Sequence, residues 1–262
     1  MSSSTTLATF LKFSSDLKAS LEANSDVLGL VLVGSTADTS RVDEWSDHDF
    51  FVVTKTGAAE GYRRDLSWLP QSEEIVMSPR ETDHGLKVVY SNGHVLEFAV
   101  FDNEELELAS ANTYEVTIDR SDIGVRMQAI AEQSKPKIVD FEVEFEIFLG
   151  HILIGVGRDR RGEHLIAGQF ARGMCLSSVL GLIRVSKSPL PGSEHKEDNL
   201  NRYRRFEQQY PNYASQLNEI LQNSVEECFR DLFEFVLRVL RDELSPRQLT
   251  QADIVKQRFG WT

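Results

Sequence analysis

The sequence has little cysteine: only Cys175 and Cys228 occur among its 262 residues. Both fall within apolar patterns of helical spacing, and no group of cysteine and histidine has the spacing of a zinc site. These shortages exclude a disulfide framework and a zinc-finger module. We expect two buried free thiols in a reducing compartment.

Long hydrophobic runs are also missing. No stretch approaches eighteen uninterrupted apolar residues, so we expect no membrane span. The first six residues have neither the basic segment nor the apolar core of a signal peptide. Together these absences predict a cytoplasmic protein without a membrane partner.

Positive charge is scarce. The chain has 28 basic and 41 acidic residues, and its formal net charge is −13. Binding to a phosphate backbone needs clustered Lys and Arg, so the balance argues against a nucleic-acid partner. It is compatible with small molecules, including cationic ones.

What the sequence does contain is a pair of carboxylates at the start of an apolar strand. An apolar run over 27–33 leads into Gly34-Ser35, and a second strand begins near Asp47-His48-Asp49. Residues two apart on a strand point to the same face, so Asp47 and Asp49 project together and His48 faces the other way. Carboxylate oxygens suit Mg²⁺, and a Gly-Ser turn offers backbone N–H groups and a hydroxyl to phosphate. The pattern predicts a site for a metal-bound nucleoside triphosphate.

A third carboxylate would complete a two-metal site, in which the ions lie about 3.5–4 Å apart. The best candidate is Glu97, in the middle of the apolar segment 95–101, where an acid is costly unless it is paired or metal-bound. Asp102 is the second choice, since it also suits the cap of a following helix. The plain alternative for Glu97 is a solvent-facing strand position.

Two neighbours of the carboxylate pair have other expected roles. His48 is expected to pack as a strand histidine rather than to bind metal. Trp45 precedes the pair and is expected either to stack on a base or substrate or to anchor its loop.

The chain divides by pattern into two domains, residues 1–135 and 136–262. Residues 133–136 have the composition of a linker. The first domain is predicted to be α+β, with a helix at 7–21, short helices at 62–69 and from 104, and strands at 27–33, 49–54, 74–78, 86–90 and 94–101. Ser91-Asn92-Gly93 marks a hairpin between the last two strands. The second domain is predicted to be an all-α bundle with helices at 139–158, 163–185, 213–242 and 246–259.

Gly34-Ser35, eleven intervening residues, Asp47-x-Asp49 and a later apolar strand carrying Glu97 resemble the signature of the DNA polymerase β-like nucleotidyltransferase superfamily. The motif spans about residues 27–102. The helical domain that follows is similar in arrangement to that of small bacterial antibiotic nucleotidyltransferases of the kanamycin, streptomycin and lincosamide types. The resemblance implies a nucleotidyltransferase-fold mixed β-sheet with flanking helices, followed by a helical bundle.

The resemblance also implies roles for these residues. Gly34 and Ser35 would bind the β- and γ-phosphates of a nucleoside triphosphate, and Asp47 and Asp49 would hold Mg²⁺. Glu97 would share a second metal and help to lower the pKa of the acceptor hydroxyl. The reaction would move a nucleoside monophosphate, AMP from ATP, onto a small hydroxylated acceptor such as an aminoglycoside or a lincosamide, and pyrophosphate would leave.

Enzymes of this kind often take a base and phosphate-binding cations from the helical domain. Glu163 follows the basic run 158–161 and is a candidate base, although an acid there also complements a helix N-terminus. Arg172 is a candidate phosphate ligand, but its spacing does not place it on the same helix face as Glu163.

Two other functions stay open. The chain could be a toxin–antitoxin nucleotidyltransferase that modifies a partner protein, or a non-catalytic nucleotide-binding module. The retained set of Asp47, Asp49 and Glu97 speaks against a module, because a sensor has no need of all three. A homodimer is expected if the apolar stripes of the helical domain exceed what one chain can bury.

Overall fold

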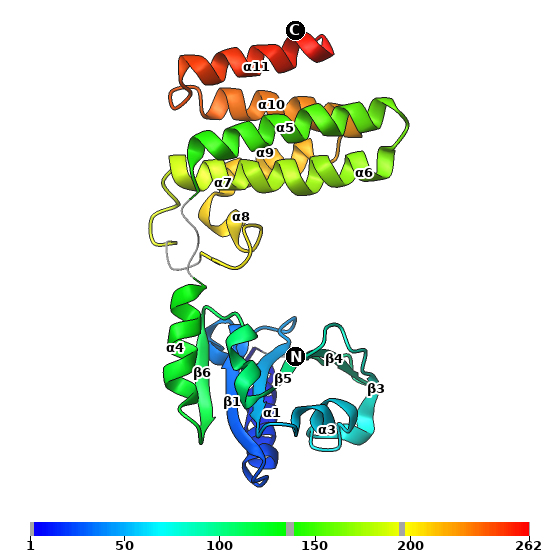
Figure 1. Ribbon diagram of the computed structural model, residues 1–262, viewed down its shortest axis with the longest axis vertical. Coiled ribbons are helices and arrows are strands. Elements are labelled where there is room, and N and C mark those ends of the chain that lie inside the picture. Colours follow the sequence, from blue (N-terminus) through cyan, green and yellow to red (C-terminus); the bar gives the residue numbers. More distant parts are fainter. Residues whose placement is uncertain (1–2, 135–138, 194–196, 262) are drawn as a thin grey trace. The chain divides into compact units, whose positions relative to one another are not determined.

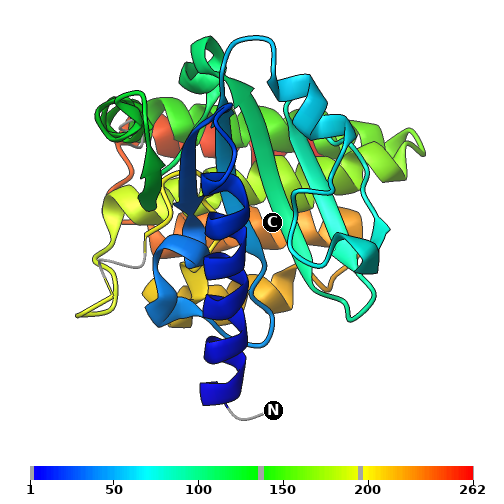
Figure 2. The ribbon, with the colours of Figure 1, turned by 90° about the horizontal axis from the view of Figure 1, so that it is seen from below.

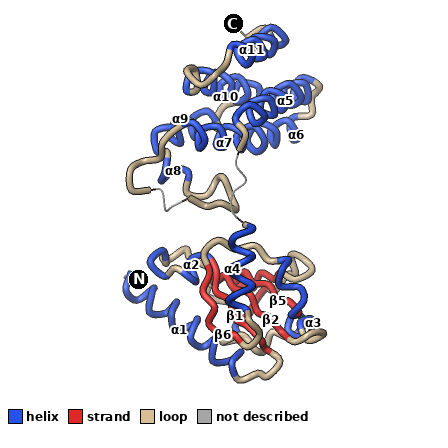
Figure 3. Tube along the Cα trace, turned by 60° about the vertical axis from the view of Figure 1, so that its left-hand side comes forward, coloured by secondary structure: helices blue, strands red, loops and turns tan. Residues whose placement is uncertain are grey.

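The structure is a computed structural model, and it describes residues 3–134, 139–193 and 197–261. The chain forms two compact units, Met1–Lys135 and Pro136–Thr262 (Figure 1). All the strands belong to the first unit, and the described part of the second is helical (Figure 3). The predicted linker extends over Lys135 and Pro136, which lie outside the described residues.

The first unit is built on a six-stranded mixed sheet in the order β3-β4-β5-β2-β1-β6. Its strands are β1 (Val27–Val33), β2 (His48–Thr54), β3 (Ile75–Met77), β4 (Gly85–Tyr90), β5 (Val95–Asp102) and β6 (Tyr114–Asp119). β2 and β5 are parallel, and the other neighbouring pairs are antiparallel. The predicted α+β class with a mixed sheet is confirmed.

The hairpin between β4 and β5 forms where its turn residues predict. Gly93 has φ +84°, in the region that favours glycine, and the Tyr90 N–H donates to the His94 carbonyl at 2.9 Å. The turn sets the register across the pair, so that Lys87 lies opposite Glu97.

Helices cover both faces of the sheet, because β2 alternates between two apolar clusters. Phe50 and Val52 pack under α1 (Ser3–Glu22), which crosses one face (Figure 2). Val53 belongs to the cluster formed with α4 (Ile123–Gln133) on the other face. Asp49 precedes Phe51 by two residues in β2, so both side chains lie on the same face. The Asp49 side chain therefore projects from the α4 face of the sheet.

Short helical elements differ most from the predictions. They are α2 (Gly34–Ala37), η1 (Thr39–Arg41), α3 (Ala59–Arg64), η2 (Ser72–Glu74) and η3 (Asn103–Leu108). α3 begins three residues before the predicted helix at 62–69, because the Ala59 N–H donates to the Asp102 carboxylate at 3.0 Å. The helix predicted from 104 is a 3₁₀ segment capped by Asp102. β6 and α4 have no counterpart among the predictions.

The second unit is a helical bundle, as predicted. Its elements are α5 (Phe141–Arg160), α6 (His164–Gln169), the π-helical η4 (Phe170–Cys175), α7 (Leu176–Ser186), α8 (Phe206–Gln209), α9 (Pro211–Ile220), α10 (Val225–Val239) and α11 (Pro246–Phe259). Phe145 and Phe148 of α5 are fully buried, so this side of α5 faces the core of the unit. Gly155 lets α5 approach α10, since a Cβ there would lie 2.2 Å from the Phe229 ring.

The predicted helix over 213–242 is in fact two helices. α9 ends at Ile220, and Ser224 opens α10 with a capping box that includes Glu227. Such a box satisfies two N–H groups at a helix start, so it favours a new helix over a continuous one.

One continuous helical stretch, His164–Ser186, is long and apolar enough to cross a membrane by length and composition. An 18-residue window in it has mean hydropathy 1.4, and 56% of that window is buried inside the protein. Cys175 and Cys228 are buried and free, as predicted. Burial raises the pKa of the Cys175 thiol, which makes it a poor nucleophile.

Replacing Phe50 tests how much the packing between the sheet and α1 stabilises the first unit. Its ring is fully buried and stacks on Phe98 at a centroid distance of 4.8 Å. Phe50→Ala is expected to lower the free energy of unfolding by about 3–5 kcal/mol in urea denaturation. Val125→Ala, at a 71% exposed residue, is the control and is expected to change it by less than about 0.5 kcal/mol. Equal effects would contradict the packing argument.

Candidate metal centre

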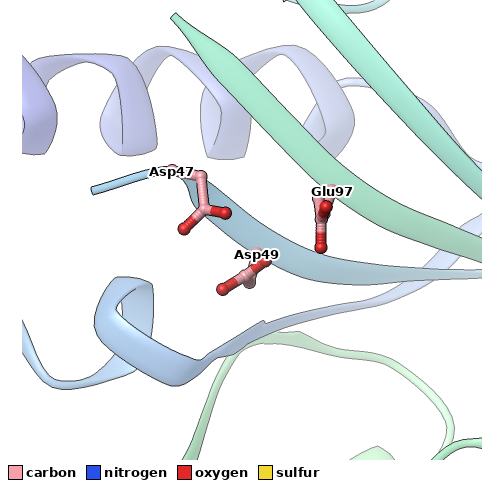
Figure 4. A group of neighbouring side chains, drawn as sticks. All are labelled: Asp47, Asp49 and Glu97. Carbon is pink, nitrogen blue, oxygen red and sulfur yellow. The ribbon is translucent and has the colours of Figure 1, made fainter. Parts of the chain in front are cut away.

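Three carboxylates gather where β2 begins. Asp49 and Glu97 are direct partners in the in-register parallel ladder of β2 and β5, so their side chains project from the same face. Asp47 immediately precedes β2. One ligand oxygen from each residue lies within 4.8 Å of the others (Figure 4). The predicted third carboxylate, Glu97, is in this group, and Asp102 is not.

The donor set fits a hard divalent cation. Asp47 and Asp49 are half-buried and Glu97 is exposed, so all three remain reachable from solvent. Like charges this close repel one another, and a bound cation removes the repulsion. Carboxylate oxygens with room for water or phosphate oxygens are the ligands that Mg²⁺ takes.

Lys87 also belongs to the site, and sequence reasoning missed it. Its Nζ lies 2.6 Å from Glu97 Oε1 and 3.5 Å from Glu81 Oε2. The hydrogen bond to Glu97 raises the pKa of Lys87, which keeps the ammonium charged. Counting outward from the Ser91-Asn92-Gly93 turn places Lys87 opposite Glu97, so this pair could have been predicted from the hairpin sequence.

The expected cost of an acid in this apolar strand does not by itself require a metal at Glu97. The side chain is 46% exposed and already has an ionic partner. The sheet face around it is not covered, so burial does not require a metal there. Its membership of the cluster instead follows from its register with Asp49.

Gly34 brings the backbone against the carboxylates. It has φ +60°, and a Cβ at this position would lie 2.9 Å from Asp49 Oδ2. The expectation that its N–H is free for phosphate is wrong, because this group donates to the Thr113 carbonyl at 3.1 Å. The Ser35 hydroxyl has no hydrogen bond within the described residues. The turn also fixes the start of β2, since the Asp49 N–H donates to Thr36 Oγ1 at 2.8 Å.

His48 faces away from the cluster, as predicted. It is fully buried, stacks on Phe10 at 3.7 Å between ring centroids, and its Nδ1 lies 2.8 Å from His94 Nε2. Burial and the neighbouring His94 lower the pKa of His48 to about 3. The imidazole is therefore neutral at neutral pH and packs in the core.

The two candidates from the helical unit make contacts inside that unit. Glu163 pairs with Arg158 at 2.6 Å and with Arg161 at 3.1 Å. Hydrogen bonds from these guanidinium groups lower its pKa, which weakens it as a base. The Arg172 guanidinium donates to backbone carbonyls in the turn between α9 and α10. Their roles as base and phosphate ligand stay predictions.

Similarity to known proteins is found among solved structures. No family model and no curated protein matches the chain. Solved structures do match: an aminoglycoside 6-adenyltransferase from Bacillus subtilis has 12% identity, with 95% of this chain and 90% of that chain covered and a TM-score of 0.33. A nucleotidyltransferase-like protein from Exiguobacterium sibiricum 255-15 has 12% identity, with coverage of 95% and 88% and a TM-score of 0.33.

A STING-associated CdnE c-di-GMP synthase from Capnocytophaga granulosa has 11% identity, with coverage of 98% and 82% and a TM-score of 0.33. The chain is similar to nucleotidyltransferases. The predicted resemblance to nucleotidyltransferases is therefore confirmed.

Replacing Gly34 tests its contact with Asp49, and Gly57 provides a matched control. Both have positive φ, but a Cβ at Gly57 meets nothing within 4 Å. Each change to Ala is expected to cost about 1–2 kcal/mol of unfolding free energy. Only Gly34→Ala is expected to weaken Mn²⁺ binding, by about tenfold in calorimetric titration, because it displaces Asp49. Equal Mn²⁺ affinity in the two variants would refute the role given to Gly34.

Removing the Lys87 ammonium is expected to strengthen cation binding, since it competes for Glu97. Because the Lys87–Glu97 ion pair is exposed, Lys87→Met is expected to bind Mn²⁺ about two- to fivefold more tightly than the wild type. Lys55→Met is the control, because Lys55 pairs with Asp26 at 3.1 Å and lies outside the carboxylate cluster. Titration by electron paramagnetic resonance measures both. Binding no tighter in Lys87→Met than in Lys55→Met would show that Lys87 does not compete.

Proposed function

We propose that this protein is a Mg²⁺-dependent nucleotidyltransferase that moves AMP from ATP to a hydroxyl group of a small acceptor. The convergence of Asp47, Asp49 and Glu97 beside the Gly34 turn carries the proposal. Nucleotidyl transfer needs a set of carboxylates for divalent cations and a tight turn next to it, and this group of residues supplies both. The similarity to solved nucleotidyltransferases is consistent with this class of reaction.

The carboxylates would hold the metal, with Asp47 and Asp49 on the triphosphate side and Glu97 sharing a second ion. Bound there, Mg²⁺ supplies positive charge that offsets the triphosphate and the developing charge of transfer. The Ser35 hydroxyl would donate to a phosphate oxygen. In the reaction the acceptor oxygen forms a bond to the α-phosphorus, the bond to pyrophosphate breaks, and the hydroxyl proton passes to a base.

Glu163 as that base and Arg172 as a phosphate ligand are parts of the proposal that rest on the resemblance. The lowered pKa of Glu163 limits its basicity while Arg158 and Arg161 hold it. A role as base therefore requires that these contacts loosen when the acceptor binds.

The acceptor is proposed to be a small cation, because the chain has a formal net charge of −13. An acidic surface attracts cationic ligands and repels nucleic acid. Aminoglycosides and lincosamides are hydroxylated amines of this kind, so antibiotic modification in the cytoplasm is the specific form of the proposal. The buried free thiols suit a reducing compartment.

Loss of either aspartate is the direct test. With ATP, MgCl₂ and a panel of aminoglycosides and lincosamides, the wild-type chain is expected to form an adenylylated product detected by mass spectrometry. Asp47→Asn and Asp49→Asn are expected to lower kcat/KM at least about 100-fold, the size of effect seen when one charge-stabilising group is lost. Asp26→Asn, a carboxylate outside the cluster, is the control and is expected to keep full activity.

The same assay separates the alternatives. Mg²⁺-dependent ATP binding without transfer to any acceptor would overturn the enzyme proposal in favour of a binding module. Transfer only to a copurifying protein would replace the small acceptor by a protein partner. Full activity in Asp49→Asn would refute the metal site itself.

A further inference from the structure

A cavity of about 700 Å³ lies in the first unit, on the side of the sheet that carries α1. Its wall comes from the first half of α1, from residues 43–48 before and at the start of β2, and from the β4–β5 hairpin around Gly93. His48 lines it, whereas Asp49 and Glu97 project from the opposite face. Asp47 lines the cavity and also belongs to the carboxylate cluster, so the two sites share one side chain.

The charge of the wall is negative. Asp43, Glu44 and Asp47 line it together on one short segment. Lys12 also lines it, but its ammonium is held by Asp16 at 2.5 Å. A wall of this sign attracts a cation and repels the phosphates of a nucleotide.

An aromatic side chain stands beside these carboxylates. Trp45 is 85% exposed, so it does not anchor its loop in the core. Of the two roles expected for it, stacking on a base or substrate is the one that is left. Its backbone N–H donates to Asp43 Oδ1 at 2.9 Å, and the Asp43 N–H donates to Ser46 Oγ at 2.9 Å. These bonds order the turn that carries the indole and the carboxylates. The rings of Phe10 and Phe13 form the apolar part of the wall.

We infer that this cavity binds a small organic cation, an amine with a ring-sized apolar body. The carboxylates attract the ammonium group, the indole face adds a cation–π contact, and the phenylalanine rings take the apolar body. A cavity of this volume matches a ligand of drug-like size.

Asp47 places the occupant of the cavity next to the carboxylate cluster. If the proposed function holds, and on that condition only, the occupant is the acceptor, with its hydroxyl at the Asp47 end. The cation site itself does not depend on the proposed function, because the wall alone selects the ligand.

The test measures binding without ATP or metal, by calorimetry and by quenching of tryptophan fluorescence in the full chain. The probes are lincomycin and tyramine, with kanamycin as a polycation that lacks an apolar body and 4-ethylphenol as an uncharged match for tyramine. At least one amine is expected to bind, and 4-ethylphenol at least tenfold more weakly than tyramine if tyramine is the ligand. Asp43→Asn/Glu44→Gln and Trp45→Ala are each expected to weaken amine binding at least fivefold.

The control is Glu22→Gln/Asp26→Asn, which removes the same charge from exposed positions outside the cavity and is expected to bind the amine as the wild type does. No binding of any amine to the wild type would overturn the inference. Binding that is equally strong in the cavity variants and in the wild type would also overturn it, because the amine would then lie elsewhere.

Turnover distinguishes this inference from the proposed function. If both hold, the cavity variants raise KM for the acceptor and leave KM for ATP unchanged. Transfer that is unaltered in the cavity variants would overturn the cavity as the acceptor site and leave the metal centre intact. Amine binding that is lost in these variants, in a chain without transferase activity, would support the cation site and refute the enzyme.

Discussion

The candidate site depends on one interaction, the in-register parallel pairing of β2 with β5. This pairing places Asp49 directly opposite Glu97, and the approach to β2 adds Asp47. A shift of one residue would turn Glu97 to the other face of the sheet and leave two carboxylates. The register is held by burial, because Phe50 and Phe98 occupy the next paired positions and stack under α1.

The same strand start serves two faces of the sheet. Asp49 points to the face of the carboxylate cluster, and His48 points to the cavity beside α1. Asp47 lies before the regular strand and belongs both to the carboxylate cluster and to the lining of the cavity. One carboxylate is thus shared by the candidate metal centre and the cavity, an arrangement consistent with the proposed transfer from a metal-bound triphosphate to a cationic acceptor. Negative charge dominates both, so a cation bound at either place would reduce the repulsion among the carboxylates.

Backbone contacts from distant segments complete the site. Gly34 touches Asp49 at the end of β1, and its N–H is held by Thr113 next to β6. Lys87 reaches Glu97 from β4. Besides β2 and β5, which carry Asp49 and Glu97, the site therefore depends on β4 and on the residues next to β1 and β6. The helical unit has its own aromatic core, and Glu163 and Arg172 take part in its internal contacts.

Local chemistry could be read from the sequence alone: five of the six strands and the turn at Asn92-Gly93, the closeness of Asp47 and Asp49, the acidic charge and the helical second unit. Alternation and turn preference act over a few residues, so they can be read along the chain. The break before Ser224 was also readable in its capping box. Only the tertiary structure decided the partners of Gly34, the exposure of Glu97 and Trp45, and the cavity beside α1. These depend on strand order and burial between segments far apart in sequence, which local pattern does not encode.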